Sequence, residues 1–485
     1  MIFNSFTFLV FFVVVFLIYH LLLRERTKAQ NILLLIASYF FYGYADWRML
    51  PILVGATIIY YILSIYIEKC SEKHAARLKT IGVIFGIGLL GYFKYLNFFV
   101  DAFATLFTKM GMQVNEHSFN IIMPLGISFF TFRLISYVLE VHRGRIQASH
   151  NFVNFATYVA FFPCILSGPI DRPNTFLPQL ETKRIFDYAM AVDGCRQILW
   201  GLFKKVVIAD NLATYVDLVW NNSSSMIPQS GSTLVLAMIL YLLQLYADFS
   251  GYSDMAIGVS KLLGIRIANN FKTPLFALNI SDYWKRWHIS LTSWLTDYIF
   301  VPLNVKYRDL GKWGTAIAIL VTFSVSGLWH GANWTYVLWG VYHGLLYLPL
   351  IFMGAFYKKA KLKTNKLGLP IFKDFCRILL TMLLVIVGLL LFRAPDVSTA
   401  WIYTKGIFNL SMFTIPNLIS KAYYIPTFLT ICMMLIIEWI NRDQAHGLNL
   451  DKITHAWIRY VIYYVLMFFV LINMGEEQTF IYFQF

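Results

Sequence analysis

Long apolar runs separated by short polar loops recur along the whole chain. A helix crosses the hydrocarbon core of a bilayer with about 20 consecutive apolar residues. The runs that approach this length are Thr7–Leu23, Ile32–Tyr44, Met49–Ile67, Thr80–Val100, Phe152–Ile165, Ser232–Tyr246, Thr315–Trp329, Trp334–Phe352, Ile378–Phe392, Ile425–Ile440 and Ala456–Met474. The pattern predicts an all-α polytopic membrane protein with roughly 10 to 13 transmembrane helices, and with re-entrant and amphipathic helices in the shorter stretches.

The composition is typical of a membrane protein. Hydrophobic residues make up 59% of the 485 residues and charged residues only 13%, whereas a soluble globular protein has about a quarter charged residues. The opening stretch "MIFNSF" has no basic region and no small-residue cleavage site follows it, so that we expect the first run to be kept as a span. Because no long soluble segment interrupts the runs, we expect residues 1–485 to form one domain.

Basic residues concentrate in loops and orient the chain. The net charge is +15, and three basic loops are Arg24–Lys28, Lys69–Lys79 and Tyr357–Lys366, the last with five lysines. Cytoplasmic loops of membrane proteins carry an excess of Lys and Arg. These loops are therefore expected inside and the N-terminus outside. Since this rule accounts for the charge, we do not expect nucleic-acid binding.

A histidine stands inside apolar sequence in the stretch "SGLWHGANW". Basic residues precede the run before it and follow the run after it, so that the turn at His330 is expected to face outward. Ser326, Gly327 and Gly331 are expected to break the helix, and irregular backbone at membrane depth must line a cavity or be buried in protein. His330 at the bottom of an outward recess would suit a general base. The alternative is a buried histidine bonded to a carbonyl of a neighbouring helix.

The stretch "SDYWKRWHISLTSWL" places four bulky apolar side chains at the spacing of one helix face. They are Trp284, Trp287, Leu291 and Trp294. The spacing predicts an interfacial amphipathic helix on the cytoplasmic side, capped by Ser281 or Asp282. His288 lies beside the apolar face, where it either points into the protein or rests at the interface without chemistry.

Other polar positions favour structural roles. In "YADFSGYSDMAIG", Asp248 and Asp254 are expected to cap a helix or to form ion pairs, for instance with Arg286 or Lys272. The prolines and the glycine of "FFPCILSGPIDRP" suit a re-entrant segment more than a full span. His343 is expected on nearly the opposite helix face from the histidine of the first motif. The histidines do not cluster with carboxylates at ligand spacing, so that no metal site is predicted.

Taken in order, these motifs resemble the core of the membrane-bound O-acyltransferase family. The resemblance is strongest to its bacterial branch with the alginate O-acetylation protein, to which the D-alanyl transfer protein of teichoic acid modification is related. It implies a ring of helices around a central tunnel through the membrane, which an activated acyl donor enters from the cytoplasm. By the same resemblance, His330 in "LWHG" is the catalytic residue and His288 in "RWHI" is the second functional position.

The resemblance also implies partners and a place in the cell. The donor would be acetyl-CoA or a carrier-protein thioester, with no bound cofactor, and exported acyltransferase proteins would complete O-acylation of alginate or another exopolysaccharide at the inner (cytoplasmic) membrane. Asn333, which follows His330 by about one turn, is our candidate for orienting the imidazole or donating to the oxyanion. The alternatives are D-alanyl transfer to teichoic acid and a non-catalytic glycan-lipid transporter or export subunit.

The chain ends in the aromatic segment Phe480–Phe485. Basic residues precede the last run and two glutamates follow it, so that the C-terminus is expected outside. The aromatic side chains either anchor the tail at the outer membrane interface or dock it in the recess, where Tyr482 would face His330. The segment resembles the C-terminal motif of small partner peptides in D-alanylation systems, which implies that Tyr482 relays the acyl group.

Overall fold

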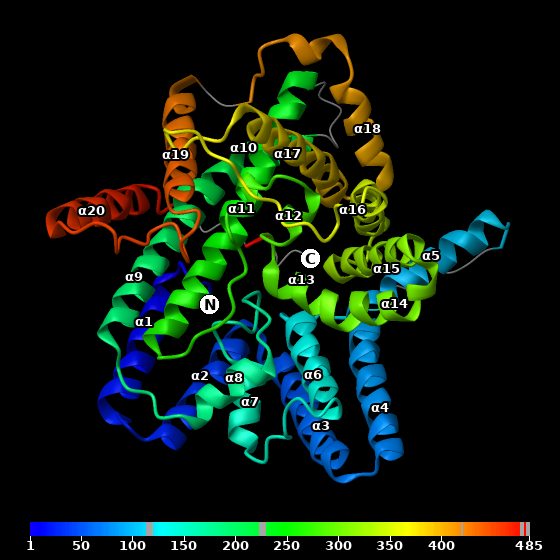
Figure 1. Ribbon diagram of the computed structural model, residues 1–485, viewed down its shortest axis with the longest axis vertical. Helices are drawn as coiled ribbons and strands as arrows, with labels where there is room; N and C mark the ends of the chain where they lie inside the picture. Colours follow the sequence, from blue (N-terminus) through cyan, green and yellow to red (C-terminus); the bar gives the residue numbers. More distant parts are fainter. Residues whose placement is uncertain (113–118, 120, 223–228, 419–420, 476–479, 482–485) are drawn as a thin grey trace. The chain divides into compact units, whose positions relative to one another are not determined.

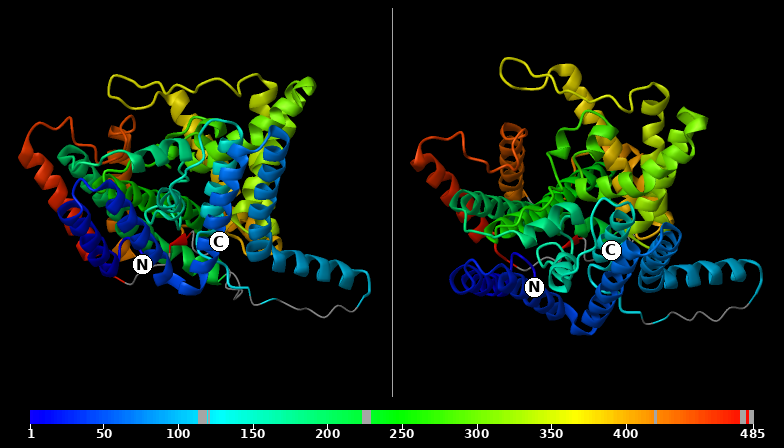
Figure 2. Two further views of the ribbon diagram at one scale, coloured as in Figure 1. Left: turned by 90° about the horizontal axis from the view of Figure 1, so that it is seen from below. Right: turned by 60° about the horizontal axis from the view of Figure 1, so that its bottom comes forward.

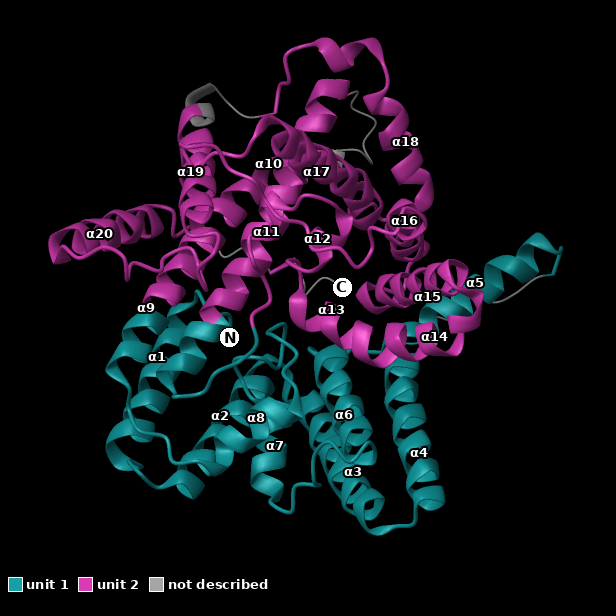
Figure 3. Ribbon diagram, viewed as in Figure 1, with its two compact units in different colours: residues 1–194, 256–268 teal, residues 195–255, 269–485 magenta. Residues whose placement is uncertain are grey.

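The computed structural model describes residues 1–485 except 113–118, 120, 223–228, 419–420, 476–479 and 482–485. The described residues form helices and no strand, apart from an isolated bridge between Thr364 and Pro370. The expected all-α class is thereby confirmed. The chain divides into two compact units, one of residues 1–194 with 256–268 and one of residues 195–255 with 269–485 (Figure 3).

Helices α1 to α8 of the described residues belong to the first unit (Figure 1). They are α1 Phe6–Leu17, α2 Thr27–Asp46, α3 Leu50–Lys69, α4 Glu72–Leu90, α5 Leu96–Lys109, α6 Ile127–His142, α7 Phe152–Ala160 and α8 Pro173–Glu181. Helices α3, α4 and α6 pack against one another and lie side by side in both views of Figure 2. The span expected at Phe152–Ile165 is wrong, because α7 ends after nine residues.

The motif "FFPCILSGPIDRP" follows α7 as an irregular segment that is buried in the first unit. The guanidinium of Arg133 on α6 donates hydrogen bonds to the carbonyl oxygens of Tyr158 at 3.1 Å and Pro169 at 3.0 Å. Asp171 accepts a hydrogen bond from the backbone N–H of Ala268 at 2.8 Å. Because irregular backbone in a membrane must find its partners inside the protein, these contacts explain how the segment tolerates its prolines and glycine.

Helix α9, Tyr188–Leu202, leads into the second unit, and the end of α11 belongs to the first unit. The further helices are α10 Asp210–Asn222, α11 Gly231–Leu262, α12 Ile280–Trp284, α13 Ile289–Leu295, α14 Val301–Lys306, α15 Lys312–His330, α16 Trp334–Phe352, α17 Phe372–Arg393, α18 Val397–Ile407, α19 Lys421–Ile440 and α20 Ala456–Ile472. A π-helical segment, Phe203–Ala209, joins α9 to α10.

Six helical segments of the described residues are long and apolar enough to cross a membrane. They are Thr27–Lys69, Glu72–Lys109, Gly231–Leu262, Lys312–His330, Trp334–Phe352 and Phe372–Arg393, with shorter apolar helices at Phe6–Leu22, Ile425–Ile440 and Ala456–Ile472. They confirm a multi-pass membrane protein. The number of roughly 10 to 13 spans stays a prediction.

Helices α15 and α16 form a closely packed antiparallel hairpin with His330 at its tip. A Cβ on Gly327 would lie 2.2 Å from the backbone oxygen of Tyr336, and one on Gly340 would lie 2.3 Å from that of Phe323. Only glycine therefore permits this approach of the two backbones. The expected helix break at Gly327 is wrong, because α15 stays helical to His330. Gly327 has no side chain, and this allows α16 to pack close to α15.

The close crossing makes Gly327→Ala a test of the fold. We expect a loss of about 1–3 kcal/mol of stability, because the added methyl group overpacks the hairpin. The matched control is Gly88→Ala in α4, where a Cβ would meet nothing within 4 Å. Thermal unfolding of the purified protein in detergent should show a lower midpoint for Gly327→Ala than for Gly88→Ala. Equal midpoints would contradict the tight crossing.

Candidate active site

The tryptophan-rich stretch is bent at His288 and does not form one continuous helix. Helix α12 ends at Trp284 and α13 begins at Ile289. His288 lies between them with a left-handed backbone, φ 45°, a strained conformation that is enriched at functional sites. The expected single amphipathic helix at the interface is wrong, because its apolar residues are all buried in the second unit: Trp284, Trp287, Leu291 and Trp294.

The bend is stabilised at the start of α12. Asn279 caps this helix, since its side-chain oxygen accepts a hydrogen bond from the backbone N–H of Asp282 at 2.9 Å. The expected cap by Ser281 or Asp282 is thus wrong by a few residues. Asp282 instead accepts a hydrogen bond from Nε of Arg286 at 2.9 Å, and this pair joins the first turn of α12 to the residues that follow it.

His288 is buried among aromatic side chains. Its Nδ1 lies 3.3 Å from Oδ1 of Asn270, and its ring centroid lies 4.7 Å from Phe249 and 5.8 Å from Trp329. Burial lowers the pKa of His288 to about 3, since an imidazolium would lose its hydration. The ring is therefore neutral at neutral pH.

His330 is also buried, and its ring and the ring of His288 both contact the indole of Trp329. The centroid of His330 lies 4.9 Å from Trp329, 5.1 Å from Trp339 and 5.1 Å from Phe392. The structure thus brings both predicted histidines against one indole. The expected solvated recess at His330 is wrong in this form, because only 4% of the residue is exposed and aromatic rings enclose it.

We call the space around His330 the aromatic chamber. Its lining residues are Leu245, Tyr283, Trp284, Trp287, His330, Trp339, His343, Val385, Leu389 and Phe392. Its free volume is about 10 Å³, about what one water molecule requires.

His343 is one of the residues that line the aromatic chamber, with its ring centroid 4.9 Å from that of Trp339. The expectation that His343 lies on the helix face opposite His330 is therefore wrong. The two histidines lie on different helices of the hairpin, α15 and α16, and a single helical period does not apply.

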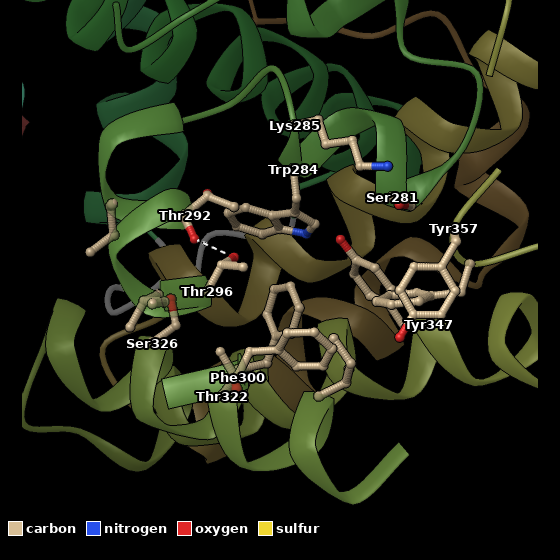
Figure 4. A pocket seen from close by; sticks show the side chains of 15 residues that line it. Ser281, Trp284, Lys285, Thr292, Thr296, Phe300, Thr322, Ser326, Tyr347 and Tyr357 are labelled. Carbon is tan, nitrogen blue, oxygen red and sulfur yellow. Dashed lines mark hydrogen bonds between the residues drawn. The ribbon is translucent and has the colours of Figure 1, made fainter. Parts of the chain in front are cut away.

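A larger apolar cavity of about 280 Å³ lies beside the aromatic chamber. Its walls come from α12 and the residue after it, α13, the π-helical segment Thr296–Phe300, α15, α16 and the residues after α16. The lining residues are Ser281, Trp284, Lys285, Leu291, Thr292, Leu295, Thr296, Phe300, Ile319, Thr322, Phe323, Ser326, Tyr347, Phe356 and Tyr357. Figure 4 shows the indole of Trp284 between Thr292 and Tyr347, with Phe300 opposite. Of the described lining residues, Trp284 alone is shared with the aromatic chamber.

A polar pocket of about 260 Å³ borders the aromatic chamber at Phe392, the described lining residue that these two spaces share. Within it, Nζ of Lys205 lies 2.8 Å from Asp210 and 2.9 Å from Asp248. Nζ of the adjacent Lys204 lies 2.6 Å from Asp254. The expected pairing of Asp248 and Asp254 with Arg286 or Lys272 is therefore wrong. The signal that sequence reasoning missed is the pair of lysines in the apolar stretch "LFKKVVIAD".

Asn333 lies at the edge of the polar pocket and closes the tip of the hairpin. Its side-chain oxygen accepts a hydrogen bond from the N–H of Thr335 at 3.0 Å, and its amide donates to the carbonyl of Pro395 at 2.5 Å. Asn333 thus caps α16 and ties it to the end of α17. Its role toward the imidazole of His330 stays a prediction.

The start of the C-terminal segment is inserted into the second unit. Phe480 is fully buried and stacks on Tyr252 with centroids 4.7 Å apart. The N–H of Ile481 donates to Asp248 at 2.9 Å, and Ile481 lines the polar pocket. These two residues are docked inside the protein and do not lie at a lipid interface. Tyr482 lies outside the described residues, so that its role stays a prediction.

The polar groups of the site do not form a metal-binding cluster: among the residues that the structure describes, no group of three or more His, Cys, Asp or Glu is arranged to hold a metal ion. The described site combines two buried histidines in an aromatic setting with ion pairs in the adjoining pocket.

Comparisons with known proteins agree with this architecture. The sequence model of the MBOAT, membrane-bound O-acyltransferase family, matches residues 6–393, which include both histidines and Asn333. The probable alginate O-acetylase of Pseudomonas aeruginosa is 37% identical over 424 residues, 86% of this chain and 77% of that protein. The peptidoglycan O-acetyltransferase of Helicobacter pylori is 30% identical over 505 residues, 93% of this chain and 91% of that protein. A teichoic acid D-alanyltransferase of Bacillus subtilis is 32% identical over 263 residues, 51% of this chain and 64% of that protein. The chain belongs to the membrane-bound O-acyltransferase family.

Proposed function

We propose that this protein moves an acetyl group from a thioester on the cytoplasmic side of the inner membrane to a hydroxyl on the far side. The acetyl group then serves O-acetylation of a cell-surface polysaccharide, such as alginate or another exopolysaccharide. Relatives named for O-acetylation match 86% and 93% of the chain, whereas a D-alanyltransferase matches 51%. This difference favours acetyl over D-alanyl transfer. Exported acyltransferase proteins are the proposed partners.

One observation carries the proposal: His330 lies in a narrow chamber that shares Trp284 with an apolar cavity and Phe392 with a polar pocket. A donor and an acceptor that approach from different sides would meet there. Reacting groups held together without water need little reorganisation in the transition state. A transporter or an export subunit has no evident need for a buried imidazole at such a meeting point.

The charge distribution supports the direction of transfer. Tyr357, in the wall of the apolar cavity, begins the five-lysine loop that we place in the cytoplasm. Arg393 and Pro395, in the wall of the polar pocket, lie at the other end of α17 from Phe372, which follows that loop. The donor, acetyl-CoA or a carrier-protein thioester, would use the apolar cavity. The acceptor would use the polar pocket, and both chain termini would lie outside.

The chemistry is a direct acyl transfer with His330 as general base. The imidazole removes the proton of the acceptor hydroxyl while the oxygen attacks the thioester carbonyl carbon. The tetrahedral intermediate collapses, the carbon–sulfur bond breaks, and the imidazolium returns the proton to the thiolate. His288, which contacts Trp329 as His330 does, would maintain the shape of the site or contact the donor. Bound metal or cofactor has no step in this scheme.

His330→Gln tests the catalytic assignment. Gln keeps most of the buried volume but an amide cannot take up the proton, so that acetylation should fall by at least about 100-fold. The readout is alkali-labile acetate on the surface polysaccharide of a deletion strain that expresses the variant. His446→Gln changes another buried histidine that lines none of the three spaces and should keep acetylation. Near-normal acetate from a well-expressed His330→Gln protein would overturn the assignment and favour the transporter or export subunit.

Single cysteines in a cysteine-free background test the direction. Lys361→Cys lies in the exposed five-lysine loop and Ser398→Cys on exposed α18. In cells whose outer layer is permeabilised and whose inner membrane is intact, a membrane-impermeant maleimide should label Ser398→Cys. Lys361→Cys should be labelled only in inside-out vesicles. The reverse pattern would contradict the orientation derived from the basic loops.

The docked tail suggests where the acyl group goes next. Phe480 contacts Phe249, which in turn contacts His288, and Ile481 reaches the polar pocket. A hydroxyl on the next residue, Tyr482, is the nearest nucleophile in sequence to this point. Tyr482 would accept the acetyl group through His330 and pass it to an exported transferase. A phenol, with a pKa of about 10, is a better leaving group than a sugar hydroxyl.

Tyr482→Phe removes only the oxygen of the proposed relay. Surface acetylation should fall to the level of the deletion strain, while mass spectrometry of the wild-type tail should find an acetyl-tyrosine. Phe483→Leu is the control, because it alters the aromatic tail and keeps the hydroxyl. Normal acetylation by Tyr482→Phe would show that the tail only fills the second unit.

A further inference from the structure

The aromatic chamber and the apolar cavity share one residue of their described linings, Trp284. We propose that Trp284 sets the size of the acyl group that reaches His330, so that acetyl passes and longer chains are held back. The inference rests on the proposed function, because it concerns the donor side of the same transfer. It would add a specificity-determining residue, Trp284, four positions before His288 in the tryptophan-rich stretch.

Trp284 is closely packed at the place where the apolar cavity and the aromatic chamber meet. Only 4% of the residue is exposed, and Trp284 lines both the apolar cavity and the aromatic chamber. Its ring centroid lies 5.3 Å from Phe323 and 5.6 Å from Trp339. Trp339 in turn lies 5.1 Å from His330. An acyl group that moves from the cavity to His330 past this shared residue would have to displace the indole of Trp284.

The indole is held by packing alone. Its Nε1–H is buried and has no hydrogen-bond partner among the described residues, although a buried indole N–H usually finds one. Trp284 is also the last residue of α12, directly before the strained bend at His288. A side chain with no polar anchor can turn aside more easily than one that is hydrogen-bonded. Its N–H also offers a donor to a carbonyl oxygen of a ligand in the cavity.

The apolar cavity and the aromatic chamber differ enough in volume to select acyl groups by their length. The apolar cavity measures about 280 Å³ and has room for a thioester arm, whereas the chamber has about 10 Å³ free. Each methylene beyond acetyl must push against the close-packed rings of Trp284, Trp287 and Trp339. A well-packed apolar site discriminates one methylene by about 10- to 200-fold. A four-carbon chain should therefore be excluded almost completely.

The test compares two acyl lengths in one reaction. Inside-out vesicles from cells with the intact acylation machinery receive the cytosolic fraction and an equimolar mixture of differently labelled acetyl-CoA and butyryl-CoA. The readout is the ratio of alkali-labile butyrate to acetate in the polysaccharide and protein fractions. The variants are Trp284→Leu, which removes the indole, Trp284→Phe, which keeps most of its volume but lacks the N–H, and Trp294→Leu. Trp294 is a buried tryptophan on α13 that lines none of the three spaces.

We expect the butyrate-to-acetate ratio to rise at least about tenfold in Trp284→Leu, to rise less in Trp284→Phe, and to stay at the wild-type value in Trp294→Leu. An unchanged ratio in both Trp284 variants, with acetate transfer still measurable, would overturn the inference. So would an equal rise in Trp294→Leu, because general loosening would then explain it. If wild-type vesicles transfer no acetate at all, the proposed function has failed instead, and the two failures are thus distinguishable.

Discussion

The close crossing of α15 and α16 is the constraint on which the site depends. Gly327 and Gly340 let the two backbones approach until a methyl group on either would strike a carbonyl oxygen. Helix association in a membrane relies on such packing, because lipid is as apolar as the side chains. The crossing fixes His330 at the tip of α15 next to Trp339 on α16, and the cap by Asn333 then ties the tip to α17.

A second constraint is the cost of buried charge. Lys204 and Lys205 follow each other in a π-helical segment and pair with different carboxylates, Asp254 and Asp248. A buried charge without a partner is strongly destabilising, so that these pairs must form together with the fold. They hold α11 against the segment after α9, and Asp248 also receives the N–H of Ile481. The same ionic network therefore supports the polar pocket and docks the tail.

The proposed chemistry rests on how the three spaces differ. In our proposal, the apolar cavity takes the uncharged part of a thioester, the aromatic chamber keeps water away from the imidazole of His330, and the polar pocket takes the acceptor hydroxyl. Trp284 and Phe392 are the lining residues that the described spaces share. In the proposed transfer, an acyl group that passes these residues carries little water with it, which would protect a reactive thioester from hydrolysis.

The sequence by itself determined the all-α membrane class and the positions of most apolar helices, because hydropathy and helix length are properties of neighbouring residues. Its local motifs also singled out the histidines at 288 and 330, whose roles stay a prediction. It misplaced whatever depends on distant residues. The stripe of Trp284, Trp287 and Trp294 belongs to a bent, buried segment, and Asp248 pairs with Lys205. One helical period could not place His343 beside the chamber of His330, because the chain reverses between them. Only tertiary packing decides which side chains separate two cavities, since that requires helices far apart in sequence to meet at one point.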